Sequence, residues 1–559
     1  MAVSLSWMDR LAGEVQQRVA SGEAGRPLVC ASGISPSGPI HMGNLREVLT
    51  AHLVAEALRS QGHEVVHLHS WDDYDRLRKV PEGFDRSFEA YVGMPLSAVP
   101  DPYGELDSWA SRYIQEFDEA LSELGIETTA VRQSERYPAG AYNLQIRRAM
   151  DARATIFDVL ASYQTAGRHQ VPVEERRARY YPFQPYCESC GTDANRVTGY
   201  KAKMVSYTCR CGHAGQMSLA DGQRISGKLV WKVDWPMRWV FEGVDFEPAG
   251  EDHHAPVGSF TVGRELVKSL YGGAEPASTV YAFVGLAGED GKMSGSAGGS
   301  VTPAAMLQVL EPALMRWLYA RRPPGQSFSI DLAPRAVQRL YDEWDQFCER
   351  SALDGADLVE RRVRSLCLST SAGPVATSER PVSFRLLGSA ADITQANRQQ
   401  IARIVAQHLD DEVQGIDAQT LIAQLQPRLD CAVTWATRLL PAEERTSVNT
   451  EFNAAVWEEL DEETRHGIRL LAAGLADNWD LASLTALVYG VPKQLLGLEK
   501  DATTTPELKK FQREFFKAVY RLLCSTETGP RLPTLLLSIG REHAYNLLVD
   551  EMKDPVMRS

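Results

Sequence analysis

The sequence lacks three features that would define special classes of protein. No apolar run approaches the roughly 20 residues that a membrane-spanning helix needs, so no membrane partner is expected. The start, MAVSLSWMDRLAGEVQQRV, has no basic segment followed by an apolar core, which argues against a secretory signal and favours an amphipathic surface helix. No internal repeat or low-complexity segment is present. We therefore expect a globular cytoplasmic protein, and we expect it to be a monomer.

An excess of positive charge is also missing. The 59 Lys and Arg residues are outnumbered by 73 Asp and Glu residues, which gives a net charge of −14. This excludes a histone-like mode of nucleic-acid binding but leaves room for local basic patches. Cysteine is scarce, with nine residues, of which four cluster and five are scattered. In a reducing compartment the scattered cysteines are expected to be small buried residues.

The N-terminal part shows the pattern of an α/β domain. Residues 27–33 predict a buried strand, 34–41 a loop rich in Pro and Gly, 42–61 a helix and 64–69 a second strand. Such a βαβ unit places the loop at the carboxyl end of a parallel strand, where open α/β sheets bind ligands. The pattern predicts a Rossmann-type catalytic domain.

The rest of the chain divides by periodicity. Residues 103–165 predict helices, and 228–300 predict strands and loops, with a buried strand at 278–288. Beyond about 330 the periodicity is helical. The predicted domains are a catalytic domain over 1–330 with a Cys-containing insert at 176–233, a helical connector and linker over 331–382, and an all-α region over 383–559.

Two distant strings suit the binding of a nucleoside triphosphate. The first contains Pro39, His41, Gly43 and Asn44 just before the predicted helix, whose N-terminal N–H groups and dipole favour phosphate. His41 can donate a hydrogen bond to phosphate oxygens, and Gly43 allows close approach. Taken alone, His41 could equally be a helix-capping residue.

The second string is KMSGS, residues 292–296, in a Gly- and Ser-rich loop. The ammonium group of Lys292 in such a mobile loop can follow the phosphates. A solvated surface loop is the simpler alternative. In this order and spacing, the two strings resemble the paired HIGH and KMSKS motifs of class I aminoacyl-tRNA synthetases, which implies catalytic roles for His41 and Lys292. The resemblance also assigns ATP binding to the members of the second string, Lys292, Met293, Ser294 and Ser296.

Further segments resemble one branch of that class, the archaeal-type class I lysyl-tRNA synthetases, over about residues 5 to 550. The resemblance implies ATP-dependent activation of L-lysine to lysyl-adenylate, with Mg²⁺ on the phosphates, and transfer to tRNA(Lys). Glutamyl-tRNA synthetases carry an Arg where this chain has Ala31, which fits a cationic substrate. The segments are 34–47, 72–81, 91–102, 180–191, 205–215, 231–239, 250–254 and 529–542.

The same resemblance suggests a lysine pocket. Gly33 and Ser35 are expected at the edge of the first strand, with Trp231 and His253 along the aliphatic stem. Tyr281 is a further candidate for the pocket wall. The three tryptophans spaced by four, Trp231, Trp235 and Trp239, could instead be core residues. The acid that binds the ε-ammonium group stays open among four candidates, Asp72, Asp73, Asp234 and Asp252.

The KMSKS-like loop departs from the family pattern. Gly295 replaces the second lysine, Ala297 stands where relatives usually have a compensating lysine, and Gly299 replaces an asparagine. The loss of a loop cation keeps two other functions open. One is a specialised paralogue that activates lysine or an analogue in secondary metabolism or resistance, and the other is a non-catalytic tRNA-binding regulator.

Four cysteines in the insert have the spacing of a zinc-ribbon-like site. Cys187 and Cys190 form one pair, and Cys209 and Cys211 follow eighteen residues later. Four thiolates complete a tetrahedron, so the predicted zinc ion is structural. Unmetallated buried cysteines are the alternative. Nearby basic residues could face an acceptor stem or be a solvated surface; they are Arg176, Arg177, Arg179, Arg196, Lys201, Lys203 and Arg210.

Near the end of the chain, one predicted helix carries a cationic stripe. Its members, spaced by four, are Lys509, Arg513, Lys517 and Arg521. Such a stripe can follow an RNA backbone, and a solvated face is an equal alternative. By resemblance, the region from about 383 is the helical anticodon-binding part, in which single-stranded bases would be read.

Overall fold

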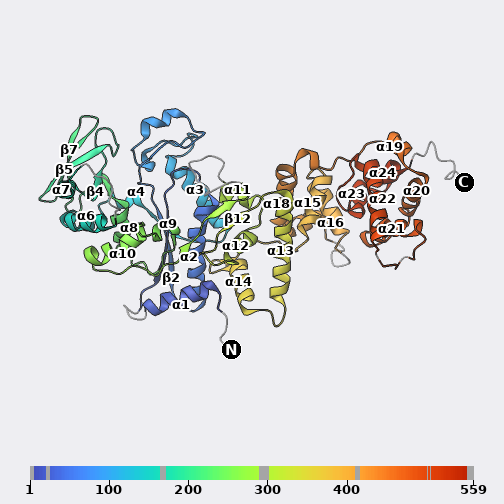
Figure 1. Cartoon of the computed structure of the whole chain (residues 1–559), viewed down its shortest axis with the longest axis horizontal. Coiled ribbons are helices and arrows are strands. Elements are labelled where there is room, and N and C mark those ends of the chain that lie inside the picture. The colour runs from blue at the N-terminus through green and yellow to red at the C-terminus, as the bar shows by residue number, and fades with distance from the viewer. Residues whose placement is uncertain are drawn as a thin grey trace. The chain divides into compact units, whose positions relative to one another are not determined.

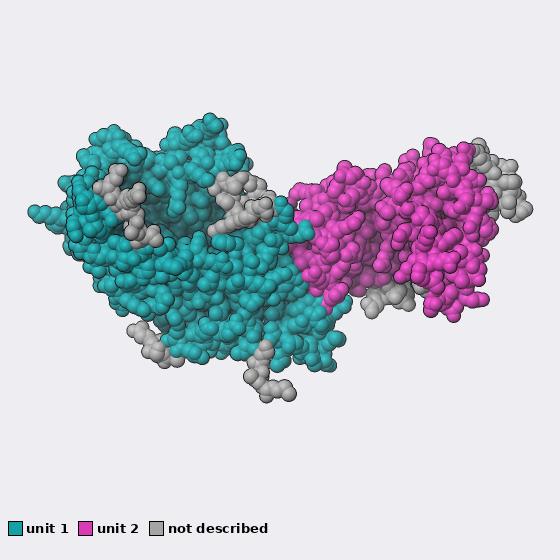
Figure 2. Space-filling view, in the orientation of Figure 1, with its two compact units in different colours: residues 1–307, 312–331, 347–376 teal, residues 308–311, 332–346, 377–559 magenta. Residues whose placement is uncertain are grey.

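The computed structural model describes residues 5–19, 25–163, 171–288, 301–409, 416–499, 501–503 and 505–549. The chain forms two compact units (Figures 1 and 2). Unit 1 comprises residues 1–307, 312–331 and 347–376, and unit 2 comprises 308–311, 332–346 and 377–559. Among the described helices, none is long and apolar enough to cross a membrane. The domain boundaries near 330 and 382 stay predictions.

A parallel sheet forms the centre of unit 1. Strand β1 (Leu28–Ile34) pairs with β2 (Val65–Trp71), which pairs with β3 (Thr129–Arg132). On the other side of β1, parallel bridges join Cys30 to Phe246 and Phe246 to Ala277. The short strands β9 (Ala249–Gly250) and β10 (Val280–Tyr281) continue this edge. The predicted mixed α/β architecture of the N-terminal region is therefore confirmed.

Helix α2 (Met42–Ser60) connects β1 to β2 and is buried almost all round. Its Arg46 side chain is anchored in the core through Nη2, whereas Nη1 has no hydrogen-bond partner among the described residues. The Arg46 guanidinium group donates to the carbonyls of Pro323, Pro324 and Gln326, and the Thr50 hydroxyl donates to the Arg46 carbonyl. This burial fixes the N-terminus of α2 beside the end of β1.

The other helices of unit 1 surround the sheet and the insert. They are α1 (Trp7–Val19), α3 (Trp109–Glu123), α4 (Gln133–Arg136), α5 (Asn143–Asp151), α6 (Arg153–Ser162), α7 (Val173–Arg179), α8 (Trp231–Phe241), α9 (Glu251–His254), α10 (Ser259–Leu266), α11 (Pro303–Leu307), α12 (Pro312–Ala320) and α14 (Leu358–Leu368). Helix α13 (Pro334–Ala352) contributes residues to both units.

Two predictions of secondary structure are wrong. The span 103–165 is not wholly helical, because its Thr- and Val-containing residues 129–132 form β3 against β2. The span 228–300 is not strand and loop throughout, because α8, α9 and α10 lie within it. The predicted strand at 278–288 is divided into β10 and β11 (Val284–Leu286), and β11 pairs with β12 (Phe328–Ile330).

The insert is a small antiparallel structure. Strands β5 (Asn195–Lys201), β6 (Met204–Cys209) and β7 (Ala214–Ser218) form one sheet. At the base, β4 (Phe183–Pro185) pairs with β8 (Gly227–Leu229), which leads directly into α8. The insert is thus joined to the α/β body by both of its ends. A final hairpin of unit 1 joins β13 (Ser369–Thr370) to β14 (Gly373–Pro374).

In the described parts of unit 2, the regular elements are helical, which confirms the predicted helical C-terminal part. One apolar core joins several helices through Leu471, Phe515, Leu522 and Leu536. The helices are α15 (Phe384–Ile393), α16 (Arg398–Ala406), α17 (Ala418–Gln424), α18 (Arg428–Thr434), α19 (Ala454–Glu459), α20 (Glu462–Gly474), α21 (Leu481–Leu495), α22 (Pro506–Cys524), α23 (Leu532–Ile539) and α24 (Arg541–Leu548).

Three histidines are buried in the core of unit 1. His52 lies on α2, and His67 and His69 lie on β2, where their rings share the Ser32 hydroxyl at 3.1 and 2.8 Å. Burial lowers the pKa of His67 and of His69 to about 3 and holds the pKa of His52 well below its usual value. Among the described residues, neither ring nitrogen of His52 has a hydrogen-bond partner.

These histidines predict a loss of stability in mild acid. Below about pH 6.5 the unfolded chain binds protons that the folded chain excludes, so the free energy of unfolding falls as the pH falls. Replacing His52→Leu removes one such group and should reduce this slope by up to about 1.4 kcal/mol per pH unit. Urea unfolding between pH 7.5 and 5 measures this slope of the free energy of unfolding. The control is His63→Gln, which replaces an exposed histidine. Equal slopes for both variants would contradict the prediction.

Candidate active site

The main cavity of unit 1 has a volume of about 430 Å³ and lies at the carboxyl ends of β1 and β2. This is the edge at which parallel sheets bind ligands. It brings together residues from five separate segments of the chain. The predicted site residues that line it are Gly33, Ser35, His41, Gly43, Asn44, Asp72, Trp231, Asp252, His253 and Tyr281.

His41 is the N-cap of α2. Its Nδ1 atom accepts a hydrogen bond from the Gly43 N–H at 3.1 Å, and the Asn44 Oδ1 atom accepts one from the His41 N–H at 3.3 Å. A neutral ring that accepts at Nδ1 carries its proton on Nε2. A Cβ atom at position 43 would lie 2.9 Å from the His41 ring, so this cap needs glycine. The structure thus contains the capping contact of His41, and its role as a donor to phosphate stays a prediction.

The remaining residues predicted to bind phosphate are Pro39 and the members of the second string. Pro39 is half-buried in the preceding loop and is not among the described residues that line the cavity. The second string, with Lys292, Met293, Ser294 and Ser296, lies outside the described residues. Its roles stay predictions.

One wall of the cavity is aromatic. The Trp231 and Trp235 rings stack with centroids 5.1 Å apart, and the His253 ring lies 6.5 Å from Trp231 and 5.2 Å from Trp235. The Arg238 guanidinium group lies 5.1 Å from the Trp231 ring centroid. Trp235 and Trp239 are buried core residues, whereas Trp231 is only half-buried. A flat apolar wall of this kind can hold an aliphatic chain.

The four predicted acids differ in their surroundings. Asp72 lines the cavity, and although burial opposes its ionisation, the Arg238 and Lys228 cations hold its pKa below the usual value. Arg238 Nη2 lies 2.9 Å from the Asp72 carboxylate. Exposed Asp252 also lines the cavity.

The other two acids are not among the described lining residues. Asp73 is buried and accepts hydrogen bonds from the Arg132 side chain at 2.7 Å and the Ser134 backbone at 2.8 Å. Asp234 is buried between the Tyr137 hydroxyl at 2.5 Å and Arg238 at 2.7 Å. Both carboxylates are therefore already paired with side chains of the protein.

Glu47 is a cavity residue that the sequence reasoning missed. It lies one helical turn after Gly43, and its carboxylate accepts from the Gly33 N–H at 2.8 Å and the Tyr281 hydroxyl at 2.6 Å. Burial raises the pKa of Glu47 to about 8. No ion pair joins Glu47 to a cation among the described residues. An acid within an otherwise buried helix, four residues after the loop glycine, was the available signal.

Acids dominate the cavity wall. The described lining residues include two arginines, Arg78 and Arg238, against six carboxylates. Burial raises the pKa of one of these, Glu247, to about 7, and its carboxylate accepts from the Trp239 indole N–H at 2.8 Å. The six are Glu47, Asp72, Asp75, Glu242, Glu247 and Asp252. Such a cavity favours a cationic group over an anionic one.

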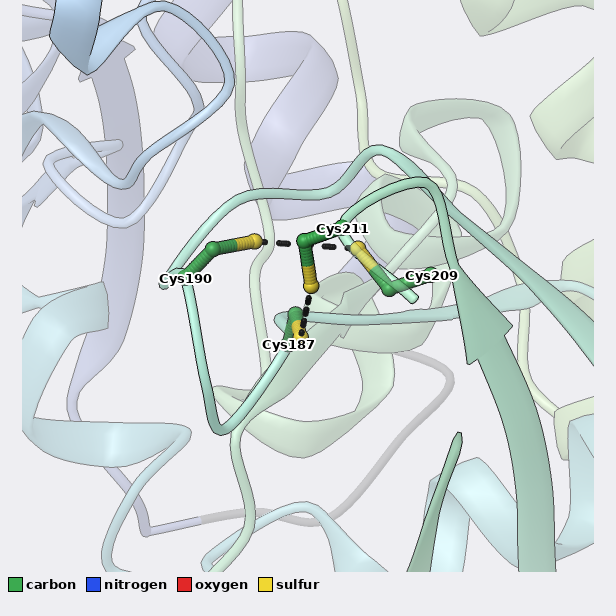
Figure 3. Close-up of side chains that lie close together, drawn as sticks. All are labelled: Cys187, Cys190, Cys209 and Cys211. Atoms are coloured by element: carbon green, nitrogen blue, oxygen red, sulfur yellow. Dashed lines mark hydrogen bonds between the residues drawn. The ribbon is translucent and has the colours of Figure 1, made fainter. Parts of the chain in front are cut away.

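The four insert cysteines converge between two loops (Figure 3). The Sγ atoms of Cys187 and Cys211 are 3.7 Å apart, and those of Cys190 and Cys209 are 3.6 Å apart. Sulfurs around one tetrahedral ion, each at about 2.3 Å, would be about 3.8 Å apart. The distances are too long for disulfides, which need about 2.0 Å. The donor set therefore fits one metal ion.

The predicted cationic stripe lies on α22 of unit 2. Lys509 and Arg513 are exposed, but Lys517 lies 3.5 Å from Glu514, and Arg521 pairs with Glu459. Half of the stripe is thus partly neutralised by neighbouring acids.

Comparisons with known proteins agree with this arrangement. Residues 5–369 match the family described as tRNA synthetases class I (K). A "Lysine--tRNA ligase" from Streptomyces coelicolor is 43% identical, covering 97% of this chain and 98% of its own. Proteins of the same name from Pyrococcus horikoshii and Pyrococcus furiosus are 34% and 33% identical, each covering 97% of this chain and 99% of their own. The chain belongs to the class I tRNA synthetases of the (K) family.

Proposed function

We propose that the chain is a lysine–tRNA ligase, which activates L-lysine with ATP and transfers it to tRNA(Lys). The observation that carries this is the acidic cavity, where Glu47 and the aromatic wall line the same space and no described cation forms an ion pair with Glu47. The near full-length similarity to proteins named lysine–tRNA ligase supports the same substrate. The decisive experiment is aminoacylation of total tRNA with each of the twenty amino acids. Charging with glutamate or arginine in place of lysine would overturn the proposal.

The first chemical step needs positioning rather than a protein nucleophile. The lysine carboxylate attacks the α-phosphorus of ATP, forming lysyl-adenylate and releasing pyrophosphate. A terminal ribose hydroxyl of the tRNA then attacks the lysyl carbonyl, and AMP leaves. His41 Nε2–H and the N–H groups at the start of α2 would stabilise the charge that develops on the phosphates. Lys292 and Mg²⁺ would supply the remaining positive charge.

The amino acid would lie between the wall and the acids. Trp231 and His253 would hold its aliphatic stem, with Gly33 and Ser35 at the strand edge. Asp72 is already compensated by Arg238 and Lys228, so we assign the ε-ammonium group to Glu47, with exposed Asp252 as the rival. Tyr281 would orient the Glu47 carboxylate.

Zinc is the metal that the cysteine cluster fits best. Four sulfur ligands select a soft or borderline ion and leave no open coordination position. Cys187, Cys190, Cys209 and Cys211 would hold the ion, whose role would be to stabilise the insert. Unit 2 would contact the anticodon part of tRNA(Lys), with exposed Lys509 and Arg513 as candidate phosphate contacts.

Removing His41 should slow activation. We expect His41→Ala and His41→Asn each to lower turnover by about 10²–10³, the usual cost of one lost transition-state donor, with little change in lysine affinity. Asparagine can still cap a helix, so that variant separates the donor from the cap. Single-turnover adenylate formation in the presence of tRNA measures the effect. A near-normal rate for His41→Asn would reduce His41 to a capping residue.

Lysine binding should depend on pH through Glu47. Its pKa of about 8 means that binding an ammonium group at neutral pH must release a proton. Lysine affinity should therefore rise up to tenfold per pH unit between pH 6.5 and 8 and then level off. Direct calorimetric binding measures it without chemistry.

Two variants separate the rival acids in this experiment. Glu47→Gln should bind lysine more weakly and show no such rise, whereas Asp252→Asn should keep the rise. A pH-independent affinity in the wild type would contradict the assignment of the ammonium group to Glu47.

The cluster should hold one zinc ion per chain. Cys190→Ser should lower the zinc content and destabilise the insert, because the binding energy of a structural metal is largely folding energy. Elemental analysis and limited proteolysis of the insert measure the two effects. The matched control is Cys348→Ser, which lies outside the cluster and should retain the metal. Metal-free wild type with four reactive thiols would argue against the site.

A further inference from the structure

Glu247 is a buried acid of the main cavity that contacts the aromatic wall. It lies shortly before β9, and its N–H donates to the Ala277 carbonyl at 3.0 Å, so its backbone is fixed at the edge of the parallel sheet. We propose that Glu247 is a positioning residue, which holds the tryptophan wall through the Trp239 indole and thereby sets the preference of the site for lysine over the shorter ornithine. This inference rests on the proposed function, since it concerns the side chain of the same substrate.

The Glu247 carboxylate anchors one tryptophan directly. Its Oε2 atom accepts a hydrogen bond from the Trp239 indole N–H at 2.8 Å, and both residues are buried. A buried N–H that loses its acceptor is costly, so this bond holds the ring at one place. The ring also packs so closely on α10 that a Cβ atom at Gly263 would lie 2.9 Å from it. Trp239 is therefore fixed both by a hydrogen bond and by close packing.

The position of Trp239 is passed on to the ring that would contact the substrate. Trp239 and Trp235 have ring centroids 5.3 Å apart, at an angle of 57°. Trp235 in turn stacks on Trp231, with centroids 5.1 Å apart at an angle of 17°. The spacing of four residues along α8 brings the three rings to the same face of the helix, and all three line the cavity. Because packed side chains transmit displacements, a loosened Trp239 would loosen the Trp231 face as well.

The fixed wall matters for the choice between two substrates of equal charge. Lysine and ornithine carry the same charged groups and differ by one methylene. The negative charge of the cavity attracts both, so discrimination depends on how closely the aliphatic stem packs against the wall. One methylene in a well-formed apolar pocket is worth about 10–200-fold in selectivity. A wall that can shift loses part of this factor.

Glu247 could instead act through its charge, as a second acid for the ammonium group. Burial raises the pKa of Glu247 to about 7, whereas the Trp235 and Trp239 side chains lower it. The hydrogen bond to Trp239 needs only an acceptor oxygen, which a protonated carboxyl group and an amide also provide. Glu247→Gln keeps such an oxygen and removes the charge, so the two roles can be separated.

The test compares the preference for lysine over ornithine among variants of the full chain. Dissociation constants are measured by calorimetry, for lysine directly and for ornithine by competition with lysine. Glu247→Leu removes the acceptor and Trp239→Phe removes the donor. Each should lower the preference by about fourfold, the share of one buried methylene. Glu247→Gln should keep the wild-type preference, even if it binds both amino acids more weakly.

A control and a double variant sharpen the test. The control is Trp109→Phe, the same change at a buried tryptophan of α3 that is not among the described residues lining the cavity, and it should keep the preference. Glu247→Leu combined with Trp239→Phe should lower the preference no further than either change alone, because both remove one hydrogen bond. A wild-type preference in either single variant overturns the proposal. Losses that multiply in the double variant, or an equal loss in Glu247→Gln, also overturn it.

A structural effect and a failure of the proposed function give different results. A purely structural role would lower the Tm of the variants and leave the preference unchanged. If Glu247→Leu does not fold, the preference of Trp239→Phe against that of Trp109→Phe decides, and equal values overturn the proposal. A wild type that does not charge tRNA with lysine refutes the function. A wild type that charges it but binds lysine and ornithine alike refutes only the role of Glu247.

Discussion

Four buried charged residues and the half-buried Asp75 join the parts of the chain that form the active-site cavity. Lys228, from β8, contacts Asp75 and lies 3.4 Å from Asp72 and 3.5 Å from Asp234. Arg238, from α8, lies 2.9 Å from Asp72 and 2.7 Å from Asp234. The end of β2, the last strand of the insert and the helix after it are thus bound together. Removing one partner of such a buried group leaves an uncompensated charge, which costs about 3–5 kcal/mol.

This cluster also determines which charged groups of the cavity wall are already paired within the protein. Because Arg238 and Lys228 are occupied by aspartates, neither cation is available to the phosphates of a nucleotide. Positive charge for phosphates can come from the N-terminus of α2, from Arg78, which also lines the cavity, and from bound metal. The same compensation does not extend to Glu47 and Glu247, which also line the cavity and form no ion pair with a described residue. An acidic pocket beside a helix N-terminus can therefore hold a cationic amino acid and an anionic nucleotide at once.

The sequence predicted the features that are encoded locally. The βαβ start, the helix cap at His41 and the convergence of the cysteine pairs follow from short-range patterns, and the structure contains each of them. Short-range patterns could not show which of the four candidate aspartates line the cavity. Asp72 and Asp73 are neighbours, yet only Asp72 is among the described residues that line the cavity, because successive residues after a strand point in different directions. The four-residue strand β3 was missed because pairing with β2 outweighs the weak signal of so short a segment.

The insert supports one wall of the active-site cavity. Strand β8 supplies Lys228 to the buried charges and runs directly into α8, which carries Trp231 and Arg238. The antiparallel pair of β4 with β8 links this wall to the segment that bears Cys187 and Cys190. A structural metal at the cysteines would hold the turn of Cys187 and Cys190 against the turn of Cys209 and Cys211. Its effect on the lysine pocket would be weaker, because the buried charge cluster fixes that wall independently.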